Sequence, residues 1–119
     1  MDKKLRNLDM YYGSRNYYRI PIFKSVVTDG VKYIMDNGYS WFVTDALSII
    51  DTKLAKKHSF LIVELNVDRK NKTAVMEIKS DDGVNVRTLY RKNYSYTDAE
   101  VDKLKLYWVE GVLMLSSEY

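Results

Sequence analysis

Residues 59–79 read SFLIVELNVDRKNKTAVMEIK, and their hydrophobic side chains recur with a period of two. The regularly spaced members are Leu61, Val63, Leu65 and Val67 in the first half, and Ala74, Met76 and Ile78 in the second. Successive side chains of a strand point to opposite faces, so this alternation predicts two strands that each bury one face. The polar run DRKNK between them predicts a turn, and strands joined by so short a turn are antiparallel.

Strand signals continue toward the C-terminus. The DDG of residues 81–83 is a hairpin-type turn, and the alternating side chains after it predict a third strand at 84–90. Alternation returns at residues 104–108. A tight turn is predicted at Glu110–Gly111, and VLMLSSEY then returns as the last strand.

Two helices are predicted upstream of the first strand. Thr28 is a suitable N-cap for a short helix at about residues 29–36, which Asn37–Gly38 ends. A longer helix is predicted at about residues 41–56, because apolar side chains recur there at helical spacing. TDAE at residues 97–100 also matches a capping box and predicts one short helical turn.

Together these elements predict an α+β fold, with two helices packed on one face of an antiparallel sheet of about five strands. The length of 119 residues suits a single domain that spans residues 1–119. Within it, residues 1–27 are predicted to form an N-terminal extended arm, because Pro21 cannot donate a hydrogen bond to a sheet ladder. The pattern leaves open both the strand order and the oligomeric state.

The residue inventory excludes several chemistries. The chain has no cysteine and a single histidine, His58, so a Cys/His zinc site is excluded. Its glycines match neither a phosphate-binding loop nor a dinucleotide fingerprint, and a G-x-S-x-G nucleophile elbow is missing. We therefore expect no catalytic residue, no metal and no cofactor, although residue counts alone do not exclude a Ser-His-Asp arrangement with His58.

Because we find neither a signal peptide nor a long apolar run, we expect a cytoplasmic protein that does not enter a membrane.

DMYYGSRNYYR, at residues 9–19, is rich in tyrosine and arginine, which are both enriched among the anchors of protein interfaces. The candidate partner-binding residues are Tyr11, Tyr12, Arg15, Tyr17, Tyr18 and Arg19. Two other interpretations stay open. The rings can pack on the edge of the core, or they can stack on nucleobases while Arg15, Arg19 and Lys24 neutralise phosphates.

The net charge of +3 is low for a nucleic-acid-binding protein and is unevenly distributed. Residues 1–27 hold six basic and two acidic side chains, whereas residues 98–119 hold two basic and five acidic ones. An acidic C-terminal segment opposes binding to a polyanion. Charge therefore favours a protein as the partner, with nucleic acid as the alternative.

Three segments of the chain read YYGSRNYYR, VVTDGVKYIMDNGYSWFVTDALSII and YTDAEVDKLKLYWVEGVLMLSSEY. In them the chain resembles an uncharacterised domain family of small bacterial and phage-borne proteins, whose motifs are Tyr-Tyr-Arg, Thr-Asp-Gly-Val-Lys-Tyr and a C-terminal Ser-Glu-Tyr. The strands of residues 59–92 match that family only in pattern. Relatives tend to have histidine and tryptophan where this chain has Ile20 and Pro21, and proline where Ser116 stands, so any chemistry that uses that histidine is not expected here.

The resemblance implies a setting in phages and mobile elements but no established activity. Combined with the residues, it predicts a non-enzymatic small binding protein of phage or mobile-element type. Such a protein would inhibit, for example, a host defence protein by occupying its surface. The alternative is a nucleic-acid-binding protein that uses the Tyr/Arg-rich N-terminal arm, and a small hydrolase is a weaker third hypothesis.

Overall fold

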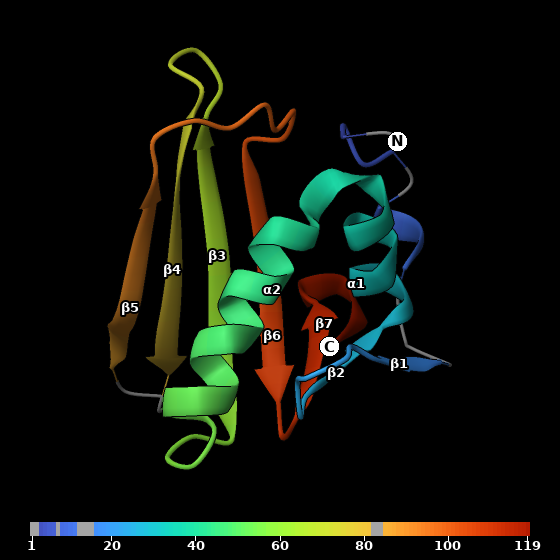
Figure 1. Ribbon diagram of the computed structural model, residues 1–119, viewed down its shortest axis with the longest axis vertical. Coiled ribbons are helices and arrows are strands. Elements are labelled where there is room, and N and C mark those ends of the chain that lie inside the picture. The colour runs from blue at the N-terminus through green and yellow to red at the C-terminus, as the bar shows by residue number, and fades with distance from the viewer. Residues whose placement is uncertain (1–2, 7, 12–15, 82–84) are drawn as a thin grey trace.

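The computed structural model describes residues 3–6, 8–11, 16–81 and 85–119, which form a sheet with a helical layer on one face (Figure 1). The sheet has seven strands in the order β1-β2-β7-β6-β3-β4-β5. Their bounds are Tyr17–Arg19 (β1), Val26–Thr28 (β2), Phe60–Asp68 (β3), Thr73–Asp81 (β4), Val86–Tyr94 (β5), Lys103–Val109 (β6) and Val112–Leu115 (β7). β2 runs parallel to β7, and the other neighbouring strands are antiparallel. The sheet is therefore mixed, and our prediction of two helices on an antiparallel sheet of about five strands is wrong.

One helical stretch, residues 29–54, covers the sheet. Its parts are α1 (Asp29–Ile34), η2 (Met35–Tyr39), α2 (Ser40–Ile49) and η3 (Ile50–Leu54). Inside η2, Asn37 and Gly38 leave the helical region, and Gly38 has a φ of 101°. The signal that we interpreted as the end of a first helix thus produces a kink, because the chain resumes its helical path immediately after Gly38. Thr28 is confirmed as the N-cap, since its hydroxyl accepts a hydrogen bond from the backbone N of Val31 at 3.4 Å.

The antiparallel meander of β3, β4 and β5 is confirmed. Leu61, Val63 and Leu65 on β3 are fully buried, as the alternation predicted. β5 continues to Tyr94 instead of ending near residue 90. β6 and β7 form the expected hairpin, and its turn places Glu110 and Gly111 at positive φ.

The helical turn predicted at residues 97–100 is wrong, because residues 96–101 have no regular secondary structure. The hydroxyl of Thr97 accepts a hydrogen bond from the backbone N of Ala99 at 3.1 Å, as an N-cap does. The backbone N of Glu100, however, donates to the hydroxyl of Tyr39 at 3.2 Å. A long-range contact with the kinked helical stretch therefore takes the place of a second intrahelical bond.

We predicted an extended arm for residues 1–27. The described residues of this segment pack against the rest of the chain. Leu5 is 4% exposed and belongs to the core, and a short 3-10 turn, η1, spans Leu8–Met10. β1 and β2 form a hairpin at one edge of the sheet, with Tyr18 opposite Val27. Within the described part of the chain, none of the helices has the length and hydrophobicity needed to cross a membrane.

Candidate partner-binding surface

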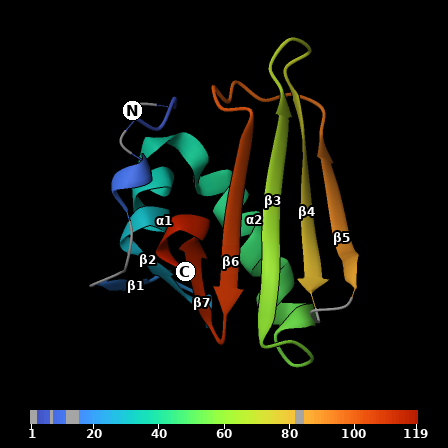
Figure 2. The ribbon, with the colours of Figure 1, turned by 180° about the vertical axis from the view of Figure 1, so that it is seen from behind.

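The face of the sheet opposite the helical layer is open. In Figure 2, strands β6, β3 and β4 lie in front of α2, and no helix of the described residues crosses them on that side. Directly paired residues share one face of a sheet, so the register identifies the side chains on the open face. One row across five strands consists of Arg19, Val26, Val112, Val109 and Phe60. A second row consists of Met114, Tyr107, Ile62 and Lys79.

Most of these side chains are hydrophobic, and together with Tyr119 they form what we call the apolar patch. Its members are Val26, Phe60, Ile62, Tyr107, Val109, Val112, Met114 and Tyr119. The rings of Phe60, Tyr107 and Tyr119 contact one another, with centroid separations of 5.4, 5.7 and 5.0 Å. Tyr119 is 72% exposed and the others, apart from Ile62, are half-buried, so the patch still offers apolar area to a partner.

Charged residues occupy the adjoining part of the open face. Glu64 is nearly buried there and forms ion pairs with Lys79 at 2.6 Å and with Lys103 at 3.1 Å. Burial by itself would raise the pKa of the Glu64 carboxyl, but the hydrogen bonds from both lysines outweigh it and hold that pKa below its usual range. Glu64 thereby cross-links β4 and β6 through their solvent-facing side chains.

Two basic side chains border the apolar patch without an acidic partner among the described residues. Arg19 is exposed and lies in the row of Val26. The ammonium of Lys105 lies 5.4 Å from the centroid of the Tyr107 ring, which is a cation–π distance. The border of the patch is thus able to pair with carboxylates.

The structure separates the six residues that we predicted as partner-binding. Tyr17 and Arg19 are exposed and share the open face, because they alternate with Tyr18 along β1. Tyr18 instead donates a hydrogen bond from its hydroxyl to Asp29 at 2.9 Å, at the start of α1. Tyr11 stacks on Tyr33 at a centroid distance of 5.1 Å. The remaining two, Tyr12 and Arg15, lie outside the described residues.

The patch contains aromatic residues that our sequence analysis did not select. Phe60 and Tyr107 occupy the solvent-facing positions of period-two segments, where polar residues are expected. A large ring at such a position was the available signal. The register between β3 and β6 places the rings of Phe60 and Tyr107 in contact. The local sequence pattern of either strand does not predict this register.

A serine, an aspartate and the histidine do lie around one cavity of about 360 Å³. The hydroxyl of Ser25 donates to Asp51 at 2.6 Å and accepts from Nε1 of Trp108 at 2.9 Å. His58 lines the same cavity, but within the described part of the chain it has no hydrogen bond to Ser25 or Asp51. The serine proton is therefore directed at a carboxylate instead of an imidazole, and this hydrogen bond connects the residue before β2 to η3.

The described residues also contain no group of three or more His, Cys, Asp or Glu side chains that could hold a metal ion.

Comparison with known proteins agrees with the fold and names no activity. A crystal structure of a protein of unknown function from Enterococcus faecalis is similar, with a TM-score of 0.53 and 14% sequence identity over 84% of this chain and 93% of that one. At this identity the likeness concerns the fold alone. No curated protein matches the chain. The family of unknown function DUF6876 matches residues 2–119, which confirms the predicted resemblance to an uncharacterised family, and the chain belongs to DUF6876.

Proposed function

We propose that this chain is a non-enzymatic binding protein that occupies the surface of a partner protein through its open sheet face. The observation that carries the proposal is the apolar patch, with its aromatic cluster of Phe60, Tyr107 and Tyr119 on a face that no described helix covers. Contiguous apolar surface with a polar border is typical of interaction sites. Exposed Tyr17 and Arg19 extend the same face to the edge of the sheet.

The border of the patch defines the chemistry of the partner. Arg19 and Lys105 have no acidic partner among the described residues, whereas Glu64 is already neutralised by Lys79 and Lys103. A complementary surface is therefore apolar at its centre and carries carboxylates at its edge. The phage-like setting that the family resemblance implied makes a host defence protein with such a surface the first partner to test.

Charge reversal at the border tests the proposal without disturbing the core. A tagged wild-type chain and the double variant Arg19→Glu/Lys105→Glu are used to capture proteins from host lysate. The matched control is Arg69→Glu/Lys72→Glu, which changes the charge by the same amount on exposed residues of the β3–β4 turn. Circular dichroism checks that all three chains melt alike.

We expect a protein partner that wild type and the control retain in stoichiometric amount and that Arg19→Glu/Lys105→Glu loses. Retention by all three chains would place the interface elsewhere. If sedimentation shows that the purified chain associates only with itself, and the border variant is monomeric, the patch binds a second copy and the proposal of a different partner protein is wrong.

A further inference from the structure

A cavity of about 340 Å³ opens between the helical kink and the end of β5, away from the apolar patch. Its lining residues are Trp41, Tyr94, Tyr96, Thr97 and Asp98. Trp41 and Tyr94 meet edge to face at a centroid distance of 4.9 Å, and Tyr96 is 67% exposed. Aromatic rings on adjoining walls provide a site for a flat ring system, which we call the aromatic cavity.

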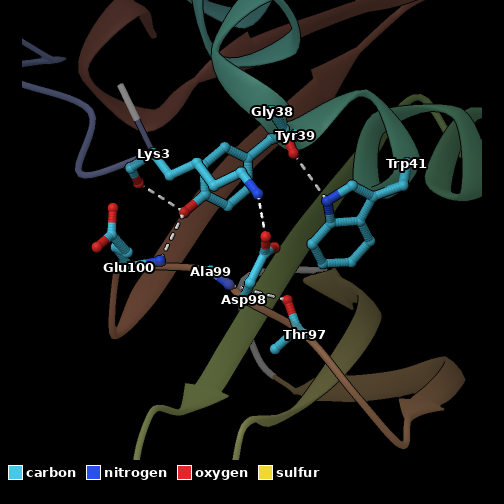
Figure 3. A network of polar contacts seen from close by, with 8 residues as sticks. All are labelled: Lys3, Gly38, Tyr39, Trp41, Thr97, Asp98, Ala99 and Glu100. Carbon is cyan, nitrogen blue, oxygen red and sulfur yellow. Dashed lines mark hydrogen bonds and ion pairs between the residues drawn. The ribbon is translucent and has the colours of Figure 1, made fainter. Parts of the chain in front are cut away.

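The walls of the aromatic cavity are held by hydrogen bonds. Nε1 of Trp41 donates to the carbonyl of Gly38 at 2.9 Å, so the kink orients the indole (Figure 3). The hydroxyl of Tyr94 donates to Asp45 at 2.7 Å, and Lys92 pairs with the same carboxylate at 3.1 Å. Burial, followed by the hydrogen bond to Asp45, raises the pKa of Tyr94, which therefore stays protonated as the donor. The site thus has preformed walls.

A second cavity, of about 420 Å³, adjoins the first and shares Thr97 and Asp98 with it. Its other lining residues are Lys3, Arg69, Lys72, Ala99 and Glu100. We call it the basic cavity. Arg69 and Lys72 come from the β3–β4 turn, and the backbone N of Thr97 donates to the carbonyl of Lys72 at 2.8 Å, which fixes that turn against the shared wall. Figure 3 shows Tyr39 between Lys3 and Glu100, where its hydroxyl donates to the Lys3 carbonyl at 2.7 Å.

The distribution of charge decides which ligand the two cavities suit. In the aromatic cavity, Asp98 is paired with Lys3, and Asp45 behind Tyr94 is paired with Lys92. A cationic ligand would therefore find no uncompensated carboxylate on the aromatic side. In the basic cavity, Lys72 has no acidic partner among the described residues, and Arg69 makes one long contact of 3.9 Å with exposed Asp102. Three basic side chains and two carboxylates line the basic cavity, so its lining carries a net positive charge and suits an anion.

We propose that the two cavities together bind a nucleoside phosphate unit, with the base in the aromatic cavity and the phosphate against Arg69 and Lys72. Stacking on tryptophan and tyrosine accommodates any base, and basic side chains neutralise the phosphate. The unit can belong to a free nucleotide or to a single-stranded nucleic acid, since both present the same two groups. This site is separate from the open sheet face and does not depend on the function proposed for it.

Two titrations of the purified full-length chain test the site. The first follows the anisotropy of a fluorescein-labelled single-stranded oligonucleotide of ten deoxyadenosines at low and at moderate salt. The second follows tryptophan emission during addition of AMP. Trp108 is 3% exposed, so quenching by a stacked base reports on Trp41. We expect saturable binding of at least one probe, and a stronger salt dependence for the oligonucleotide.

The variants separate this site from other surfaces. Tyr96→Ala removes an exposed ring and should weaken binding by about tenfold, and Arg69→Glu/Lys72→Glu by at least as much. Arg19→Glu/Lys105→Glu has the same change of charge on the open face and should leave the affinity within about twofold of wild type. Quenching should disappear in Trp41→Phe.

Each outcome bears on the proposal. Tight, salt-sensitive binding of the oligonucleotide with weak binding of AMP identifies a single strand as the source, and comparable binding of both identifies a free nucleotide. If neither probe binds at millimolar concentration, or if the open-face variant loses as much affinity as the turn variant, the site does not exist. Should Trp41→Phe fail to fold, the anisotropy measurement with Tyr96→Ala decides in the same way.

Discussion

The carboxylate of Glu118 joins residues from both ends of the chain. It accepts hydrogen bonds from the hydroxyl of Thr28 at 2.7 Å, from the backbone N of Gly30 at 3.1 Å and from the backbone N of Leu115 at 2.9 Å. The first N–H groups of a helix have no intrahelical acceptor, and the buried Glu118 carboxylate accepts the hydrogen bond of Gly30 at the start of α1. This contact joins the Thr-Asp-Gly segment at residues 28–30 to the Ser-Glu-Tyr at the C-terminus of this chain.

Gly30→Ala tests that junction. A Cβ at residue 30 would lie 2.5 Å from Oε1 of Glu118 and 2.5 Å from Cδ1 of Leu115, so the carboxylate or the helix has to move. We expect a loss of about 1–3 kcal/mol in the free energy of unfolding, measured by urea denaturation. Ser48→Ala, on the exposed side of α2, is the control and should stay within about 0.5 kcal/mol of wild type. Equal stability of the two variants would show that the junction tolerates a methyl group.

At the scale of elements, the kink in the helical stretch and the ion pairs between strands determine how the two layers meet. Gly38 allows the helical stretch to turn, and its carbonyl then orients Trp41. Across the sheet, Glu64 on β3 links to Lys79 on β4 and Lys103 on β6. Both features depend on one residue each, so each can be tested by one substitution.

Gly38→Ala forces a side chain into the left-handed region, where φ is 101°, and brings its Cβ to 2.9 Å from the flexible end of Lys3. We expect a loss of about 1–3 kcal/mol in the free energy of unfolding. Gly111→Ala is the matched comparison, because Gly111 also has positive φ but has no atom within 4 Å of its Cβ. The excess cost at Gly38 measures the contact with Lys3. A smaller loss for Gly38→Ala than for Gly111→Ala would contradict this account.

Glu64→Gln should change how stability depends on pH. Because the folded-state pKa of Glu64 is lowered, its contribution is present above the unfolded-state pKa of about 4.3 and is lost as pH falls through the lower folded-state value. At pH 7 the variant should lose about 1–3 kcal/mol, and its deficit relative to wild type should shrink at pH 3. Thermal melts at both pH values measure this. Asn66→Ala, a neutral change on β3, is the control, and its difference in stability from wild type should be the same at pH 7 and at pH 3. A Glu64→Gln deficit in stability that stays constant between the two pH values would contradict the prediction.

For the whole molecule, the strand order places the N-terminal hairpin beside the last strand. β2 adds in parallel to β7, so the N-terminal hairpin extends the sheet beyond the last strand. β1 forms one edge of the sheet and β5 forms the other (Figure 1). β3 and β5 are both nine residues long, but β3 has neighbours on two sides and β5 on one. Exposed Arg87 and Arg91 along β5 oppose the addition of a further strand.

Amide hydrogen exchange should reflect this architecture. We expect protection at every amide in the centre of β3, and protection alternating with fast exchange along β5, because every second amide of an edge strand points to solvent. Exchange followed by NMR at neutral pH measures the pattern. Uniform protection along β5 would mean that another chain covers this edge in solution.

Particular residues show how far sequence reasoning reached. The alternation around Val63, the cap at Thr28 and the turn at Glu110 are local features, and the structure confirms them. The capping box at Thr97 failed, because the Tyr39 hydroxyl competes for the backbone N of Glu100. For the candidate surface, the arginine and tyrosine of β1 were selected, but the rings of β3 and β6 were not.

The sequence by itself determined where the last five strands and the helical stretch form, and it excluded cysteine-based chemistry, because periodicity and composition are properties of the chain alone. Only the tertiary structure decided the strand order, the open sheet face, and the meeting of Lys3, Trp41 and the β3–β4 turn around one pair of cavities. The physical reason is that these features join residues far apart in the chain. Their proximity depends on the packing of the whole core, to which no local pattern of side chains corresponds.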